Sequence, residues 1–364
     1  MTVLYDEGQE AIATESRRVL DAQMDKEKLL ALLQSTGNFD EGFWKTAVDQ
    51  GWTGLAVPEE YGGLGLGLLE MGLIAQSAGA VIAGAPFLTG NYGATQLLAA
   101  SDNDALKQAW LPKLADGSAI GVVALSETSS PLPQRPEAFL AGGMLSGAKT
   151  PVAGALKADF AIVWALQDSG PALALVELDE GTCTAIDSFD NSRLYAGLDF
   201  DKAPASVLIA GKAAPKAALD TLARMAVVCA HEQVGGAEAA MMIARDYALE
   251  RKAFGQPIGA FQSIKHRIAE LYGLVEIARA NCIDAAAREG QEGFLLAACA
   301  ARLSAGEAYD TAARDAVQIH GGIGVTWQLG LHLHMRRARS LAGELGNPYF
   351  WEDLLVAELE ASAP

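Results

Sequence analysis

The sequence predicts an α+β fold in which a sheet-forming middle segment lies between two helical segments. In the first and last thirds, apolar residues recur with the 3.6-residue period of α-helices. The middle third instead contains short apolar runs bounded by Gly, Pro, Asp and Ser, a pattern typical of strands. We therefore expect an N-terminal helical domain at 1–117, a β-barrel-like domain at 118–212 and a C-terminal four-helix bundle at 213–364.

The first segment is predicted to be helical because two amphipathic stretches, 10–22 and 40–51, precede an apolar stretch at 68–80. A G-x-G-x-G run at 63–67 raises the possibility of a dinucleotide-binding loop. Such a loop should follow a buried strand within a strand-helix-strand unit, and no strand pattern precedes this one. We interpret the run as a glycine-rich connection between packed helices.

The middle segment is predicted to form strands, because its apolar runs are short and come at near-regular intervals. The β-domain ends near Gly211. From Pro215 the helical period returns and persists. The expected strands are 120–127, 159–166, 171–178, 183–189 and 196–209, and the expected helices after them are 217–250, 262–288, 292–319 and a stretch beyond Trp327.

Composition excludes several classes of function. A net charge of -18 argues against nucleic acid as a general partner, although a few local cations suffice for a nucleotide cofactor. The four cysteines are far apart and lack C-x-x-C spacing, so we expect buried thiols, a reducing compartment and no metal site. The acidic, polar start predicts no signal peptide, and no apolar run approaches the length of a membrane span. These features predict a cytoplasmic protein.

The stretch 245–280 combines residue types that suit a nucleotide. Arg251 stands at the predicted end of one helix, Phe254 lies in the bend that follows, and Gln262 begins the next helix. A fixed cation, an aromatic face and an amide within one helical hairpin suit a phosphate and a heteroaromatic ring. The alternative is an ordinary helical hairpin whose arginine forms a salt bridge.

Two motifs resemble the signatures of the acyl-CoA dehydrogenase family. They are ERKAFGQPIGAFQ, which contains Arg251, and DAVQIHGGIGVTWQLGLHLHMRRAR at 315–339. The resemblance extends nearly end to end, and it implies the helical, β, helical architecture and FAD as cofactor. In the family these motifs hold the pyrophosphate and adenosine of an FAD whose flavin ring lies in the neighbouring subunit. The implied cofactor-binding residues are Arg251, Phe254, Gln262, Gln318, Gly321 and Gly322.

The resemblance also implies a reaction, the α,β-dehydrogenation of an acyl-CoA. A glutamate removes the α proton and the flavin takes the β hydride. Counted from the second motif, the usual glutamate position holds Leu345, followed by a matching Gly346. Glu344 is one residue early, and one residue on a helix turns a side chain by about 100°. The other base position known in the family falls at Met225 and Ala226, so neither usual position carries a carboxylate.

The flavin-ring loop departs from the family pattern in a similar way. Ser126 and Glu127 match the loop that contacts the ring, and Ser126 is a candidate cofactor-binding residue. Lys149 matches the following stretch. The tryptophan that lies near the ring is replaced by Pro151, and the threonine that donates toward the flavin by Ala153. Neither replacement offers a π-face or a hydroxyl.

Together these matches predict a supporting subunit of a hetero-oligomeric acyl-CoA dehydrogenase. Its partner, a second dehydrogenase-like subunit, would hold the flavin ring, the base and most of the site for a bulky steroid side-chain or dicarboxyl acyl-CoA. Electron-transferring flavoprotein is the implied acceptor. The alternatives are a self-sufficient enzyme using Glu344 as base, a purely structural subunit, and a flavin oxidase or monooxygenase on the same fold.

The histidines have simpler interpretations. His332 and His334 stand at i and i+2 on a predicted helix, where they face different sides and do not form a metal pair. His231 and Glu232 are expected to form a polar pair within the bundle.

Overall fold

The computed structural model describes residues 5–23, 25–83, 87–128, 130–179 and 181–361. These residues pack into two compact units. Unit 1 contains the described residues of Met1–Leu30, Leu68–Ala83 and Ala226–Pro364. Unit 2 contains those of Ala31–Gly67 and Gly84–Met225. The three-domain division expected from the sequence stays a prediction.

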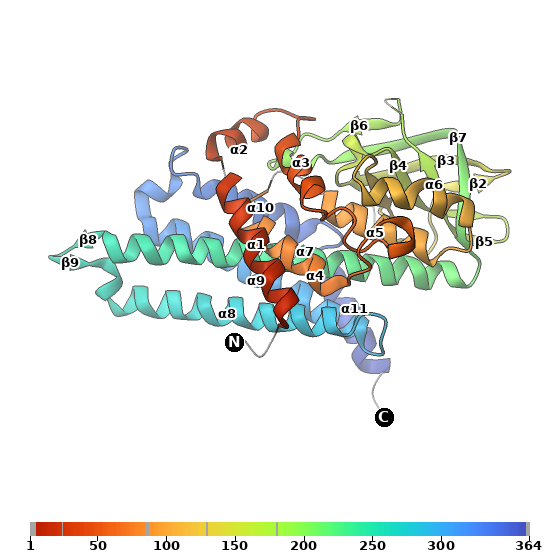
Figure 1. Ribbon diagram of the computed structural model, residues 1–364. Helices are drawn as coiled ribbons and strands as arrows, with labels where there is room; N and C mark the ends of the chain where they lie inside the picture. Colours follow the sequence, from red (N-terminus) through yellow and green to blue (C-terminus); the bar gives the residue numbers. More distant parts are fainter. Residues whose placement is uncertain (1–4, 24, 84–86, 129, 180, 362–364) are drawn as a thin grey trace. The chain divides into compact units, whose positions relative to one another are not determined.

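Unit 1 is helical, and its long helices α7 and α8 are joined at one end by a short β-hairpin (Figure 1). The α7 helix begins in unit 2 and continues into unit 1. The elements of unit 1 are α1 (Glu7–Gln23), α4 (Leu68–Ala80), α7 (Ala213–Glu250), β8 (Lys252–Ala253), β9 (Gln256–Pro257), η4 (Ile258–Ala260), α8 (Gln262–Ala287), α9 (Phe294–His320), η5 (Gly321–Val325), α10 (Leu331–Gly343) and α11 (Pro348–Ala361).

The contact between α4 and α7 depends on glycine. A Cβ atom on Gly79 would lie 1.9 Å from the carbonyl oxygen of Glu232, and one on Gly235 would lie 1.8 Å from that of Gln76. A third glycine of α4, Gly72, leaves room for the fully buried ring of His231. Small residues therefore let the two backbones approach, which explains why α4 is both apolar and glycine-containing.

Unit 2 contains the sheet and the helices beside it. Its elements are α3 (Glu41–Asp49), η1 (Glu59–Tyr61), α5 (Phe87–Ala100), α6 (Asp104–Ala115), β1 (Gly121–Ala124), β2 (Phe139–Ala141), β3 (Met144–Val152), η2 (Ala155–Lys157), β4 (Phe160–Gln167), β5 (Gly170–Glu177), β6 (Cys183–Ala185), η3 (Asn191–Arg193) and β7 (Ala196–Ala210). The α2 helix (Lys26–Leu33) spans the division between the units.

The strands close into a barrel. They follow the order β1-β4-β2-β3-β7-β5, and β6 pairs with β7. An additional β4–β5 pairing closes the ring β4-β2-β3-β7-β5, with β1 paired to β4. The β4 strand is fully buried from Phe160 to Ala165, and its β5 partner is buried from Ala172 to Val176. These are the two most continuous apolar runs of the middle segment, because a strand covered on both faces needs no polar alternation.

Most predicted elements are present. The stretch 68–80 coincides with α4, and Asp40 caps α3 by accepting a hydrogen bond from the Phe43 amide at 2.9 Å. The prediction missed the β2–β3 hairpin, because β3 alternates between buried and exposed positions and lacks an apolar run. It also made β6 too long, since only Cys183–Ala185 of the expected 183–189 is a strand. The G-x-G-x-G run is a connection with no helix or strand that leads into α4, as expected.

The remaining general expectations concern cysteines and membranes. All four cysteines belong to the described residues, where they form no disulfide; three are buried and Cys183 is half-buried. Among the helices of the described ranges, none combines the length and apolar character needed to cross a bilayer.

Candidate functional site

The first group of predicted site residues lies at the hairpin end of unit 1. Arg251 follows the last residue of α7, and its amide donates to the Tyr247 carbonyl at 2.8 Å. Ala253 and Gln256 are paired across the hairpin, so Phe254 and Gly255 are its two turn residues. Both have positive φ, 52° and 82°, as a two-residue type I′ turn requires. Arg251 and Gln262, which begins α8, are exposed.

Phe254 is unusual in two respects. Glycine and asparagine normally occupy left-handed turn positions, whereas a bulky aromatic residue there is strained. Its side chain is also 95% exposed, and its nearest aromatic neighbour, Phe261, meets it edge-on at 6.2 Å between ring centroids. A strained backbone that holds an apolar ring in solvent favours a role in binding over a role in folding.

The second motif reaches the same end of unit 1. Gln318 lies in the last turn of α9, and Gly321 and Gly322 begin η5. The ring of His320 stacks on Tyr247 of α7, with centroids 4.0 Å apart. Nearby, an Arg267–Asp315 ion pair of 2.8 Å joins α8 to α9. These two contacts place the C-terminal ends of α7 and α9, and with them the two motifs, at one end of unit 1, although Arg251 and Gln318 are 67 positions apart in the chain.

The backbone at this end leaves room for a ligand. A Cβ atom at Gly321 or Gly322 would meet no atom of the described residues within 4 Å. Both glycines, and Gln318 beside them, are exposed. Because glycine has no Cβ atom, a pyrophosphate could approach the backbone here closely, with an exposed arginine at the same end of the unit.

The turn after α10 contains the candidate base. Glu344 is 8% exposed, and Leu345 adopts a left-handed φ of 61°. Arg302, on α9, is 3% exposed and donates through Nη2 to the Glu344 carbonyl at 2.7 Å. The same guanidinium donates to the Leu341 carbonyl and to Oε1 of Gln233. A buried cation therefore holds the last carbonyls of α10, where the helix dipole favours positive charge.

The expected His231–Glu232 pair is wrong. Glu232 instead lies 2.8 Å from Nη1 of Arg337, whose Nη1 and Nη2 also donate to the Ala83 carbonyl at 3.0 Å. The Arg337 side chain is fully buried, so it needs a fixed counter-charge. Because Glu232 provides that charge, it is a poor candidate for a proton-accepting base. His231 is fully buried, and burial lowers its pKa to about 4.

The paired histidines of α10 face different neighbours, as their spacing predicts. His332 stacks on Trp327 with 4.3 Å between ring centroids. His334 is buried, and its Nδ1 lies 3.0 Å from the Tyr309 hydroxyl.

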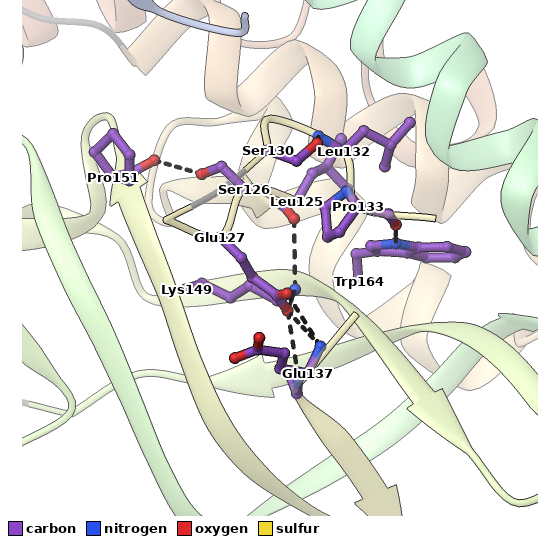
Figure 2. Close-up of polar contacts among 11 residues, drawn as sticks. Leu125, Ser126, Glu127, Ser130, Leu132, Pro133, Glu137, Lys149, Pro151 and Trp164 are labelled. Carbon is purple, nitrogen blue, oxygen red and sulfur yellow. Dashed lines mark hydrogen bonds and ion pairs between the residues drawn. The ribbon is translucent and has the colours of Figure 1, made fainter. Parts of the chain in front are cut away.

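The loop predicted to face a flavin ring lies in unit 2, between β1 and β2 (Figure 2). Nζ of Lys149, on β3, lies 2.6 Å from Oε1 of Glu127. Glu127 also accepts hydrogen bonds from the amides of Glu137 and Ala138, at 3.0 and 3.3 Å. The hydroxyl of Ser126 donates to the Pro151 carbonyl at 2.7 Å. The matched residues thus hold the loop in place through contacts within the chain.

Electrostatics at this ion pair favour a charged Glu127. Burial raises the pKa of its carboxyl group, but the Lys149 hydrogen bond and charge, with the two amide donors, hold that pKa below its ordinary value. Lys149 is 0% and Glu127 8% exposed in the side chain, so solvent screens the pair little. The sequence indicated both residues as family matches without indicating that they bind each other.

Comparison with known proteins identifies the family. Residues 6–118 match the family model of the acyl-CoA dehydrogenase N-terminal domain, and residues 216–347 match that of the acyl-CoA dehydrogenase C-terminal domain. Acyl-CoA dehydrogenase IpdE2 of Mycobacterium tuberculosis is 32% identical over 319 residues, covering 87% of this chain and 86% of the relative. The chain belongs to the acyl-CoA dehydrogenase family. Acyl-CoA dehydrogenase FadE27 of the same organism is 29% identical, with 90% of each protein covered.

Solved acyl-CoA dehydrogenase structures share the whole fold. A variant of the Tcur3481–Tcur3483 steroid acyl-CoA dehydrogenase superposes with a TM-score of 0.86 at 28% identity, covering 98% of each chain. The ChsE4–ChsE5 complex from Mycobacterium tuberculosis superposes with a TM-score of 0.88 at 25% identity, covering 100% of each chain. The expected fold class, the enzyme class and FAD as the cofactor of this family are confirmed.

The two regions predicted to bind the cofactor fit FAD unequally. The hairpin end of unit 1 offers a cation, an exposed aromatic ring, two amides and bare glycine backbone, which suit adenosine and pyrophosphate. In the unit 2 loop the Ser126 hydroxyl is bonded to the Pro151 carbonyl, and Ala153, which follows β3, has no side-chain donor. The residues present therefore fit the nucleotide half of FAD better than its ring.

Proposed function

We propose that this chain is the supporting subunit of a hetero-oligomeric, FAD-dependent acyl-CoA dehydrogenase. It completes the adenosine and pyrophosphate site for an FAD whose reactive ring lies in the partner subunit. The observation that carries this proposal is the hairpin end of unit 1, where Arg251 is exposed and Phe254 is held in solvent on a strained backbone. These groups point out of the unit, as residues that serve another chain must.

Each residue of this end has a role suited to its chemistry. Arg251 would pair with the pyrophosphate as a charge-assisted donor. Phe254 would pack against the adenine, and the amides of Gln262 and Gln318 would donate to and accept from the nucleotide. Gly321 and Gly322 would let the phosphates approach the backbone. When bound, FAD supplies the acceptor for the hydride, and the chain's residues bind and orient its nucleotide half.

Features elsewhere support placing the reaction in the partner. The usual base position holds Leu345, and the stretch at the end of β3 has Pro151 and Ala153 where the family has an aromatic ring and a hydroxyl. Glu232, another carboxylate near a known base position, is bonded to Arg337. A subunit that lends a nucleotide site but removes no proton accounts for all three features.

The partners follow from the same reasoning. The steroid acyl-CoA dehydrogenase and the ChsE4–ChsE5 complex match this chain along its whole length, which supports a second dehydrogenase-like subunit and a bulky steroid side-chain or dicarboxyl acyl-CoA as substrate. The family resemblance supports electron-transferring flavoprotein as acceptor and the cytoplasm as location.

FAD content tests this proposal. We expect the chain expressed alone to retain no FAD, and the chain co-expressed with an adjacent dehydrogenase-like gene to retain stoichiometric FAD. Arg251→Ala should remove that FAD, whereas Arg245→Ala, which changes an exposed arginine on the same helix, should not. Full flavin loading of the chain alone, or unchanged retention in Arg251→Ala, would contradict the proposal.

A second candidate is a self-sufficient enzyme that uses Glu344 as base. It is favoured by the burial of Glu344 at the turn where the family places its base, since proton abstraction from a substrate needs a carboxylate sheltered from water. Glu344→Gln would then abolish dye-coupled dehydrogenation by the chain alone while leaving FAD content unchanged. Activity that survives this substitution excludes Glu344.

A further inference from the structure

The two nucleotide-binding motifs must be held at a fixed separation to act as one site. Arg251 lies at the end of α7, and the Gln318–Gly322 segment lies at the end of α9. Helix ends fray more readily than helix centres. The Arg267–Asp315 ion pair joins α8 to α9, but its side chains are 40% and 21% exposed, so solvent screening weakens it.

A more protected contact joins α7 to α9 directly. The Tyr247 and His320 rings are stacked, with centroids 4.0 Å apart and planes inclined by 22°. His320 is 6% exposed, and its Nδ1 lies 2.7 Å from the Ala316 carbonyl, which fixes the orientation of the ring on α9. Stacking of two aromatic rings stabilises their contact beyond the burial of their surfaces from water.

Each ring is attached to one of the motifs. The Tyr247 carbonyl accepts the Arg251 amide at 2.8 Å, and the Arg251 carbonyl in turn accepts the Ile258 amide at 2.8 Å, which closes the hairpin. His320 immediately precedes Gly321, whose φ of 62° turns the chain out of α9. The residue that carries each ring is therefore bonded or directly joined through its backbone to one motif.

We infer that Tyr247 and His320 are positioning residues that lock the two motifs into one nucleotide half-site. This inference rests on the proposed function, since it concerns the same adenosine and pyrophosphate site. Neither residue needs to touch the nucleotide. Their stack orders the two motifs before the nucleotide binds, so ordering them does not reduce the binding affinity.

Binding of ADP to the full chain tests the inference, because ADP carries the adenosine and pyrophosphate chemistry without the ring. We expect His320→Ala to weaken ADP binding by roughly threefold to tenfold, the fold-change that corresponds to losing one stacked pair. His320→Phe should bind like the wild type, because it keeps the stack and loses only the bond to Ala316. On α7, Tyr247→Leu removes the stacked ring and should weaken ADP binding, whereas Tyr247→Phe keeps the ring and should bind ADP like the wild type.

The outcomes separate the inference from the proposed function. If Arg251→Ala binds ADP as tightly as the wild type, the proposed function fails. If Arg251→Ala loses ADP but His320→Ala binds normally, the proposed function stands and the inference is overturned. Rescue by His320→Phe is the result that a general structural role for the imidazole would not produce.

Hydrogen exchange provides a second readout in the absence of any nucleotide. The amides of Ala253 and Gln256, which face each other across the hairpin, should exchange faster in His320→Ala and Tyr247→Leu than in the wild type. The two phenylalanine variants should exchange at the wild-type rate. Unchanged hairpin exchange in His320→Ala, in a protein with wild-type circular dichroism, overturns the inference even where ADP binding is too weak to measure.

Discussion

Replacing Lys149 with methionine tests the buried ion pair of unit 2 (Figure 2). The substitution keeps the length and apolar stem of the side chain and removes its charge. Glu127, 8% exposed in the side chain, would then keep the two amide donors of Glu137 and Ala138 but lose its counter-ion. The Leu125 carbonyl would also lose its 3.4 Å contact with Nζ.

The expected cost follows from that geometry. Removing one partner of a buried ion pair destabilises a protein by about 3–5 kcal/mol, because the other charge is left buried. Because Glu127 keeps its two amide donors, we expect Lys149→Met to lower the free energy of unfolding by about 3 kcal/mol, the lower end of that range. Removing both charges with Lys149→Met and Glu127→Gln should cost less, about 1–2 kcal/mol, since no ion then remains buried.

The cost should depend on pH with a definite sign. In the wild type the pKa of Glu127 is lowered, so its contribution to stability is present above the ordinary carboxyl pKa and is lost as pH falls through the lowered value. In Lys149→Met, burial dominates and raises that pKa, so the variant regains stability as Glu127 takes up a proton. The difference between the two proteins should therefore shrink toward acid pH, by up to about 1.4 kcal/mol per pH unit.

Urea denaturation followed by tryptophan fluorescence measures these free energies of unfolding, with Trp164 buried beside the loop as a reporter. The matched control is Lys45→Met, which removes a lysine from a surface pair whose side chains are 76% and 56% exposed. We expect that control to change stability by less than about 0.5 kcal/mol. A cost for Lys149→Met as small as the control's, or a cost that does not shrink at acid pH, would refute the reasoning.

Three further predictions concern unit 1, each checked by urea or thermal denaturation. Arg302→Met should lower the free energy of unfolding by about 3 kcal/mol, because it removes the guanidinium that donates to the Leu341 and Glu344 carbonyls at the end of α10. Arg314→Met, which changes an exposed arginine of α9, the helix that also carries Arg302, should be nearly neutral. Equal effects of the two substitutions would contradict this prediction. Phe254→Gly should raise stability by about 1 kcal/mol by relieving a strained φ, yet weaken nucleotide binding, and a lower melting temperature would argue against strain. Gly79→Ala should cost about 2 kcal/mol through its clash with the α7 backbone, while Gly273→Ala, with open space around it, should stabilise α8; a tolerated Gly79→Ala would show that α4 can move aside.

The sequence predicted long helices well, because hydrophobic periodicity is local and repeats over many turns. The helix at 262–288 and the strand at 159–166 each coincide with an element to within one residue at either end. The β2–β3 hairpin was missed because Gly147 and Lys149 interrupt the apolar pattern of β3, and β3 shifts register against β7 at two places. Its pairing with β7 depends on residues some fifty positions away, which no local window contains.

The candidate site divides in the same way. Motif spacing in the sequence predicted the cofactor-binding residues, and it placed Arg251, Phe254 and Gln262 within one turn-linked hairpin, as the structure has them. The tertiary structure decided that Phe254 is strained and 95% exposed, and that Tyr247 lies against His320.

The buried ion pairs lie beyond sequence reasoning altogether. Arg337 and Glu232 are 105 residues apart, and Lys149 and Glu127 are 22 apart. A linear sequence shows the charges but not which of them face each other, because ion pairing depends on distance and desolvation that exist only after the chain has packed. By itself, the sequence determined the family and the fold class and predicted which motifs bind the nucleotide. Packing decided which carboxylates pair with buried cations.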